Sequence, residues 1–168
     1  MNKLILIFSW ILLIAGASAG ENIQVNFTGT VSDATCEIQT DSQNPEVNLG
    51  ELYNQDLEEA GSASEWVNFN ITLFNCPPAL KTVSAAFSGT PDGNDASLYK
   101  STGDASNVAV ELQDQNTQRA LGHGAVDTVN ILPSGNAVFN LQARAKTVVG
   151  NVTAGTIDSL IEMTYTYN

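Results

Sequence analysis

The last segment of the sequence, Gly155–Asn168, constrains the fold more than any other part of the chain. Its apolar side chains occupy every second position, with one break at Ser159: Ile157, Ile161, Met163, Tyr165 and Tyr167. The positions between them are polar, except for Leu160. A period of two is typical of a β-strand that buries one face. The sequence stops one residue after Tyr167, so we expect the edge of this strand to be covered by something other than a later strand of the chain.

Residues 1–19 have the layout of a secretory signal peptide. Lys3 provides a basic start, the run Leu4–Ile14 is apolar, and Ala17-Ser18-Ala19 is a small-residue cleavage site. The apolar run is shorter than the roughly 20 residues that span a bilayer, so we expect the mature chain not to insert into a membrane. We favour cleavage after Ala19, and cleavage after Gly20 would also satisfy the rule.

A second alternating segment follows the signal peptide. One face of this segment carries Ile23, Val25, Phe27, Gly29 and Val31, and the positions between them are Asn, Gln or Thr. We therefore expect a mature chain that begins with a free strand and ends with a strand that lacks a neighbour. Such a chain suits a subunit that polymerises by lending a strand to another subunit.

Several short motifs add to these two ends. They are Val47–Tyr53, Phe74–Pro77, Val110–Asp114 and Thr164–Asn168. With them, the whole mature chain resembles the subunits of chaperone–usher pili, and in particular the minor tip-adaptor subunits of type 1 fimbriae. Pilins of this family place a glycine fourteen positions from the C-terminus and a tyrosine at the penultimate position, where this sequence has Gly155 and Tyr167. The pairing of both end motifs with two spaced cysteines is specific.

The resemblance implies a fold and a division of the chain. The fold would be all-β: an incomplete immunoglobulin-like sandwich that lacks its last strand, with an N-terminal donor-strand extension. The divisions would be a signal peptide at 1–19, a donor-strand extension at 20–33 and a pilin domain at 34–168. The donor residues would be Ile23, Val25, Phe27, Gly29 and Val31.

The resemblance also implies partners. A periplasmic chaperone would fill the groove beside the C-terminal strand with one of its own strands, and its basic residues would bind the carboxylate of Asn168. The residues of this strand would be Gly155, Ile157, Ile161, Met163, Tyr165, Tyr167 and Asn168. At an outer-membrane usher, the extension of the next subunit would replace the chaperone strand. The chain would pass through the periplasm to a fimbria at the cell surface, with adjacent pilus subunits at both of its ends.

Composition excludes several other classes of function. The sequence has 6 basic and 18 acidic residues and a net charge of −12, which argues against binding to nucleic acid or to an anionic membrane surface. In an exported chain the two cysteines, Cys36 and Cys76, are expected to form a disulfide, because with the single His123 they cannot supply a usual tetrahedral metal site. One histidine also leaves no basis for a catalytic triad. We therefore expect no enzyme, no metal and no cofactor.

The middle of the chain predicts a β-sandwich. Alternating or short apolar segments occur at five places, separated by Gly, Pro, Asn and Asp turns. The expected strands are Trp66–Asn75, Lys81–Ser88, 108–112, Val126–Leu132 and 137–145. No segment has a helical period.

Two other functions compete with that of a polymerising subunit. An adhesin-type module could bind carbohydrate through Tyr53, Trp66 and Tyr99, although aromatic residues at such positions more often pack in a core. A terminating subunit could stop growth of the fibre. A terminating subunit would not need the apolar stripe of residues 23–31, which this chain has.

Overall fold

The computed structural model describes residues 26, 28–29, 35–39, 43 and 45–168. The chain divides into two compact units, residues 1–32 and residues 33–168. Of the expected donor residues, Ile23, Val25, Phe27 and Val31 lie outside the described residues, and Gly29 is exposed. The second unit carries the fold that follows.

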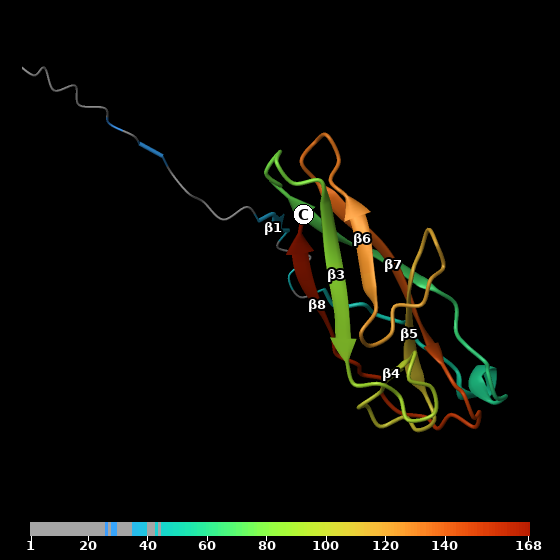
Figure 1. The fold of residues 1–168 in the computed structure, drawn as a ribbon. Helices are drawn as coiled ribbons and strands as arrows, with labels where there is room; N and C mark the ends of the chain where they lie inside the picture. Colours follow the sequence, from blue (N-terminus) through green and yellow to red (C-terminus); the bar gives the residue numbers. More distant parts are fainter. Residues whose placement is uncertain (1–25, 27, 30–34, 40–42, 44) are drawn as a thin grey trace, which may run out of the picture. The chain divides into compact units, whose positions relative to one another are not determined.

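The second unit is an antiparallel β-sandwich of two sheets (Figure 1). One sheet has the strand order β1-β2-β7-β5-β4, and the other has the order β6-β3-β8. The described elements are β1 (Glu37–Ile38), a 3₁₀ helix η2 (Asn54–Leu57), β2 (Val67–Phe74), β3 (Thr82–Gly89), β4 (Tyr99–Lys100), β5 (Ala109–Asp114), β6 (Val126–Asn130), β7 (Ala137–Lys146) and β8 (Ile161–Tyr167). The all-β class expected from the sequence is confirmed.

The five strands expected in the middle of the chain correspond to β2, β3, β5, β6 and β7, with ends that differ by a few residues. Two short strands, β1 and β4, were not expected. The C-terminal strand is shorter than expected, because β8 begins at Ile161 and not at Gly155. The prediction of one regular strand over Gly155–Asn168 was therefore wrong for its first six residues, 155–160.

The core lies between the two sheets and takes side chains from both. In β3 and β7 the inward positions are fully buried, because each strand has a neighbour on both sides in its sheet. The largest core side chains include Ile71, Phe87, Tyr99 and Phe139, each at most 1 % exposed. Along β3 and the second half of β2, buried side chains alternate with less buried ones, as the alternating apolar pattern of these segments predicts.

The disulfide is present as expected. Cys36 and Cys76 are bonded, and both residues are buried as part of the hydrophobic core. Cys36 precedes β1 and Cys76 follows β2, so the bond joins the ends of two paired strands. It thereby anchors β1, which pairs with β2 through only two residues.

A candidate strand-binding groove

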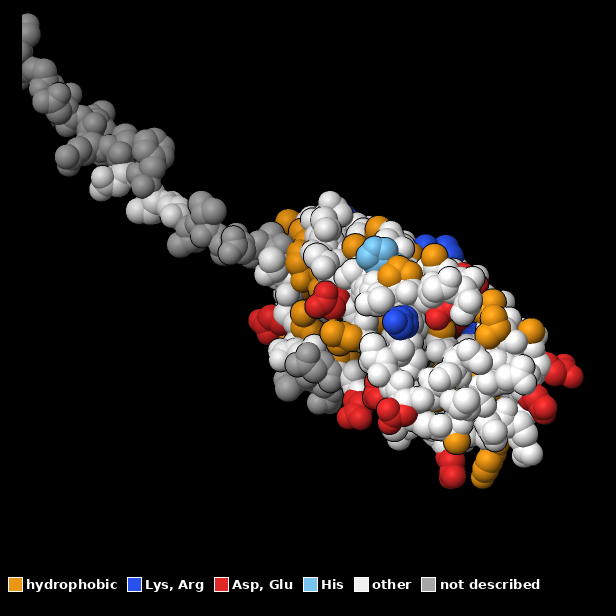
Figure 2. All heavy atoms as spheres, turned by 90° about the horizontal axis from the view of Figure 1, so that it is seen from below, with side chains coloured by type: hydrophobic (Ala, Val, Ile, Leu, Met, Phe, Trp, Pro, Cys, Tyr) orange, Lys and Arg blue, Asp and Glu red, His pale blue; other side chains and the backbone are white. Residues whose placement is uncertain are grey.

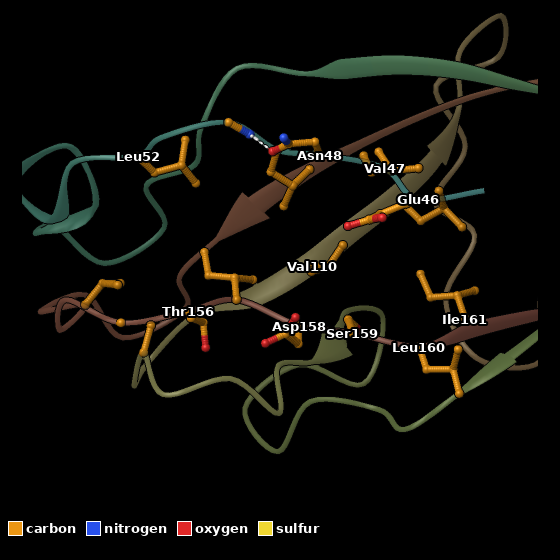
Figure 3. A pocket seen from close by; sticks show the side chains of 18 of the residues that line it. Glu46, Val47, Asn48, Leu52, Val110, Thr156, Asp158, Ser159, Leu160 and Ile161 are labelled. Atoms are coloured by element: carbon orange, nitrogen blue, oxygen red, sulfur yellow. Dashed lines mark hydrogen bonds between the residues drawn. The ribbon is translucent and has the colours of Figure 1, made fainter. Parts of the chain in front are cut away.

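A groove of about 880 Å³ opens into the core on one side of the sandwich (Figure 3). One wall is formed by residues 45–50 with the chain that follows them, and the other by residues 153–161 together with Met163. Core side chains from four strands form the floor: Phe69, Ile71, Phe87, Val110, Leu112 and Ala143. The floor is thus apolar, and of these side chains only Phe69 is partly exposed, while the others are buried.

The β8 wall has an open backbone edge. In its sheet β8 pairs only with β3. At the end of this pair, the N–H of Asn168 donates to the carbonyl of Thr82 at 3.0 Å, and the N–H of Thr82 donates to the carbonyl oxygen of Asn168 at 2.9 Å. Bonded residues alternate in an antiparallel ladder, so positions 162, 164 and 166 also bond to β3. The N–H and C=O groups of Ile161, Met163, Tyr165 and Tyr167 therefore point to the open edge.

The side chains of the same four residues are incompletely covered. Ile161, Met163, Tyr165 and Tyr167 pack against the core, yet each is only half-buried. On the neighbouring strand β3, by contrast, Val83, Ala85 and Phe87 are at most 1 % exposed. Both strands face the same core, so the difference marks the place where a further strand would cover the apolar stripe.

The wall before β8 keeps the alternation without forming a regular strand. The carbonyl of Thr156 accepts a hydrogen bond from the N–H of Ala105 at 3.0 Å, and that of Asp158 accepts one from the N–H of Thr102 at 2.7 Å. The loop of residues 101–105 thus replaces β3, which ends at Gly89, and this is why the regular ladder starts only at Ile161. Since positions 156 and 158 bond to the loop, the backbone of Ile157 faces the groove, continuous with the β8 edge.

The opposite wall, residues 45–52, belongs to neither sheet. Val47 and Leu49 pack against the core, while Glu46 before them and Asn48 between them are exposed. The N–H of Gly50 donates to Asn48 Oδ1 at 2.8 Å. Within the described part of the chain, residues 45–52 make no backbone–backbone hydrogen bond. One extended strand lying in the groove could therefore bond to both walls.

The residues predicted for the C-terminal strand divide into two groups. Gly155, Ile157, Ile161 and Met163 line the groove. Tyr165, Tyr167 and Asn168 lie on and just after β8 beyond the groove lining, where the ring of Tyr165 packs 6.0 Å from that of Phe139. Burial raises the pKa of Tyr165 to about 12.

The wall formed by residues 45–50 was not predicted as part of the site. The motif Val47–Tyr53 drew attention only as a mark of resemblance. The signal that could have located the wall is the alternation of Val47 and Leu49 with exposed polar neighbours.

The described residues offer no group of three or more His, Cys, Asp and Glu side chains that could hold a metal ion. His123 lies in a turn, where its Nδ1 accepts a hydrogen bond from the N–H of Gly89 at 3.4 Å. A search of the described residues for a helix of the length and hydrophobicity needed to cross a membrane finds none.

Comparison with known proteins agrees with this geometry. A family model described as "Fimbrial protein" matches residues 25–168. The chain is 40% identical to the S-fimbrial adhesin protein SfaS of Escherichia coli O6:K15:H31 (strain 536 / UPEC), over 99% of this chain and 98% of that protein. It is 39% identical to the protein FimG of Escherichia coli K12, over 94% of this chain and 93% of FimG. A solved chaperone–usher pilus structure, 27% identical, superposes with a TM-score of 0.67 over 92% of this chain and 100% of that one.

Proposed function

We propose a specific role for this chain, which belongs to the fimbrial protein family. The proposed role is that of a minor tip-adaptor subunit that polymerises by donor-strand exchange. The chain is a structural subunit of a chaperone–usher pilus and not an enzyme. The proposal concerns its place in the fibre and the way in which it is joined to its neighbours.

The observation that carries the proposal is the groove between two walls, each of which has an open backbone edge. The β8 edge and residues 45–52 both present backbone groups without partners in the described chain, and the floor between them is apolar. An incoming strand would supply hydrogen bonds to both walls and cover the half-buried stripe of β8. Strand addition of this kind is a known mode of recognition in chaperone–pilin complexes.

The chain's own extension would serve as the donor for a different subunit. Ile23, Val25, Phe27 and Val31 alternate with polar residues as a donor strand requires. Burying these four side chains in a neighbour's groove would contribute about 6–12 kcal/mol before hydrogen bonds and ordering costs are included. Contacts made head to tail in this way do not close and produce a filament.

Assembly would follow the order that the family implies. A periplasmic chaperone would first fill the groove, with its basic residues on the carboxylate of Asn168, and the next subunit's extension would replace it at an outer-membrane usher. The likeness to FimG over nearly the whole length of both chains supports the place at the tip.

A double substitution tests the donor-strand role. Val25→Asp with Phe27→Asp puts two charges into an apolar groove, where each is costly to bury. The variant should fold, keep its Cys36–Cys76 disulfide and form a chaperone complex, but fail to join the preceding subunit. SDS-resistant dimers in vitro and pili on cells measure this last step.

The matched control places the same two charges on the polar face, as Asn26→Asp with Thr28→Asp. This control should still assemble, because its charges would remain in solvent. A Val25→Asp/Phe27→Asp variant that fails to fold would contradict the proposal, since residues 23–31 would then be a strand of this domain itself.

A second candidate, a receptor-binding adhesin, is favoured by the similarity to SfaS. The aromatic residues considered for carbohydrate binding do not form a common platform. Tyr99 is fully buried, and its hydroxyl donates to the carbonyl of Leu121 at 2.8 Å. The ring of Trp66 is in contact with Arg144, whose guanidinium lies 4.1 Å from the ring centre. Tyr53 is exposed and lines the groove.

A further inference from the structure

The groove has an acidic rim. Glu46 lies on one wall and Asp158 on the other (Figure 3). The residues that line the groove include no Lys, Arg or His. The ion pairs found in the described part of the chain involve Glu111 and Asp127, so neither rim carboxylate is neutralised by an ion pair there. Figure 2 shows the same imbalance on one face of the molecule, where acidic side chains are spread widely and basic ones are few.

The two rim carboxylates project outward and not toward the floor. Glu46 is exposed and precedes the inward Val47, and Asp158 is exposed and follows the inward Ile157. A strand bound between the walls would alternate in the same way, with apolar side chains on the floor and the others at the rim. Its outward side chains would be cross-strand neighbours of the outward side chains of both walls. The two rim carboxylates are therefore placed to interact with charged outward side chains of a donor strand.

We propose that this groove selects a donor strand that carries a Lys or Arg at an outward position, and therefore accepts another kind of subunit in preference to a second copy of this chain. The inference rests on the proposed function, because it assigns a partner to the same groove. The chain's own extension, residues 20–33, contains Glu21 and Asp33 and has no Lys, Arg or His. A second copy would place only Asn, Gln and Thr at the outward positions 22–30, and would therefore bring no cationic side chain to the rim.

The size of the effect follows from cross-strand ion pairs. One opposite-charge pair directly across two strands favours binding by up to about fivefold over an uncharged pair. A cation beside Glu46 or beside Asp158 would therefore be preferred by up to about fivefold at low ionic strength. The preference should fall in high salt, since exposed charges are screened over about 3 Å at 1 M ionic strength.

A peptide competition tests the proposal. The mature chain, with its disulfide intact, is refolded in an equimolar mixture of two peptides, and native mass spectrometry reports the ratio of the two complexes. One peptide has the sequence of residues 20–33. The competitor is the same peptide with Gln24→Lys, Asn26→Lys or Thr28→Lys, so that the scan samples three outward positions. Each competition is run at low and at high salt.

At least one lysine peptide should be preferred by severalfold at low salt, and the preference should disappear in the chain with Glu46→Gln and Asp158→Asn. Glu65→Gln, at an exposed position outside the groove lining, is the matched control and should keep the preference. Equal capture of all peptides, or a preference that persists in the Glu46→Gln/Asp158→Asn chain, would overturn the charge selection while leaving strand addition intact. Capture of no peptide at all would overturn strand addition itself, and with it this inference.

Discussion

Gly155 lies so close to Ala105 that a Cβ on Gly155 would come within 2.5 Å of the Ala105 backbone nitrogen. The backbone of Gly155 has a φ of +157°, which side chains rarely allow. The N–H of Ala105 in turn donates to the carbonyl of Thr156 at 3.0 Å. This contact fixes one groove wall to the loop of residues 101–105. The glycine read from the sequence as a family feature thus has a steric reason.

Gly155→Ala should destabilise the domain by about 1–3 kcal/mol, because the loop backbone must move to admit the methyl group. Urea unfolding of the subunit bound to a donor-strand peptide measures the loss. Gly93→Ala is the control, since a Cβ there would meet no atom within 4 Å. Equal losses in the two variants would show that the contact at Ala105 does not constrain this wall.

The disulfide should contribute about 2–5 kcal/mol to the stability of the exported domain. Cys36→Ser should therefore lower the yield of chaperone–subunit complex, and non-reducing peptide mapping of the unaltered protein should recover Cys36 and Cys76 linked. Because either single substitution already removes the bond, Cys36→Ser with Cys76→Ser should cost little more than one alone. A double variant that loses twice as much would mean that the two cysteines stabilise the fold separately.

The strands that the sequence predicted well are those with a local pattern. In β2 and β7 the period of two is set by residues within the strand, such as Phe69 with Ile71 and Phe139 with Leu141, and both strands occur where expected. The same local rule located the half-buried stripe of β8. It could do so because the alternation of apolar and polar residues is present in the sequence whether or not another strand covers the apolar face.

The elements that the sequence did not predict depend on distant partners. Each of β1 and β4 has two residues, too few for a period, and forms because β2 or β5 lies beside it. Residues 155–160 alternate as β8 does, but they bond to the loop of residues 101–105, whose position no local pattern reveals. The second wall of the groove needed the structure, because it lies about 100 residues before the C-terminal strand in the sequence.

Stability should fall in alkali because of buried tyrosines. Burial raises the pKa of Tyr99 to about 12, whereas in the unfolded chain a tyrosine has a pKa near 10. Between these values the folded protein keeps a proton that the unfolded chain has lost, so the free energy of unfolding is unaffected below pH 10 and decreases as pH rises from 10 to 12. Urea midpoints measured from pH 9 to 11.5 should decline, and less steeply in Tyr99→Phe. Identical slopes in the two proteins would exclude Tyr99 as a source of the decline.

Neighbouring positions on β8 should differ sharply in their effect on chaperone capture. Tyr165 faces inward, half-buried against Phe139, and its backbone points to the open edge, whereas Thr166 is exposed and its backbone pairs with Ser84 of β3. Tyr165→Ser removes a ring contact and apolar burial together worth about 2–4 kcal/mol. Thr166→Ser removes one exposed methyl group and should have little effect. Co-purification with the periplasmic chaperone, measured beside the soluble yield, should therefore fall steeply for Tyr165→Ser alone. If Thr166→Ser lowers capture as much, the inward stripe of β8 is not what the chaperone strand covers.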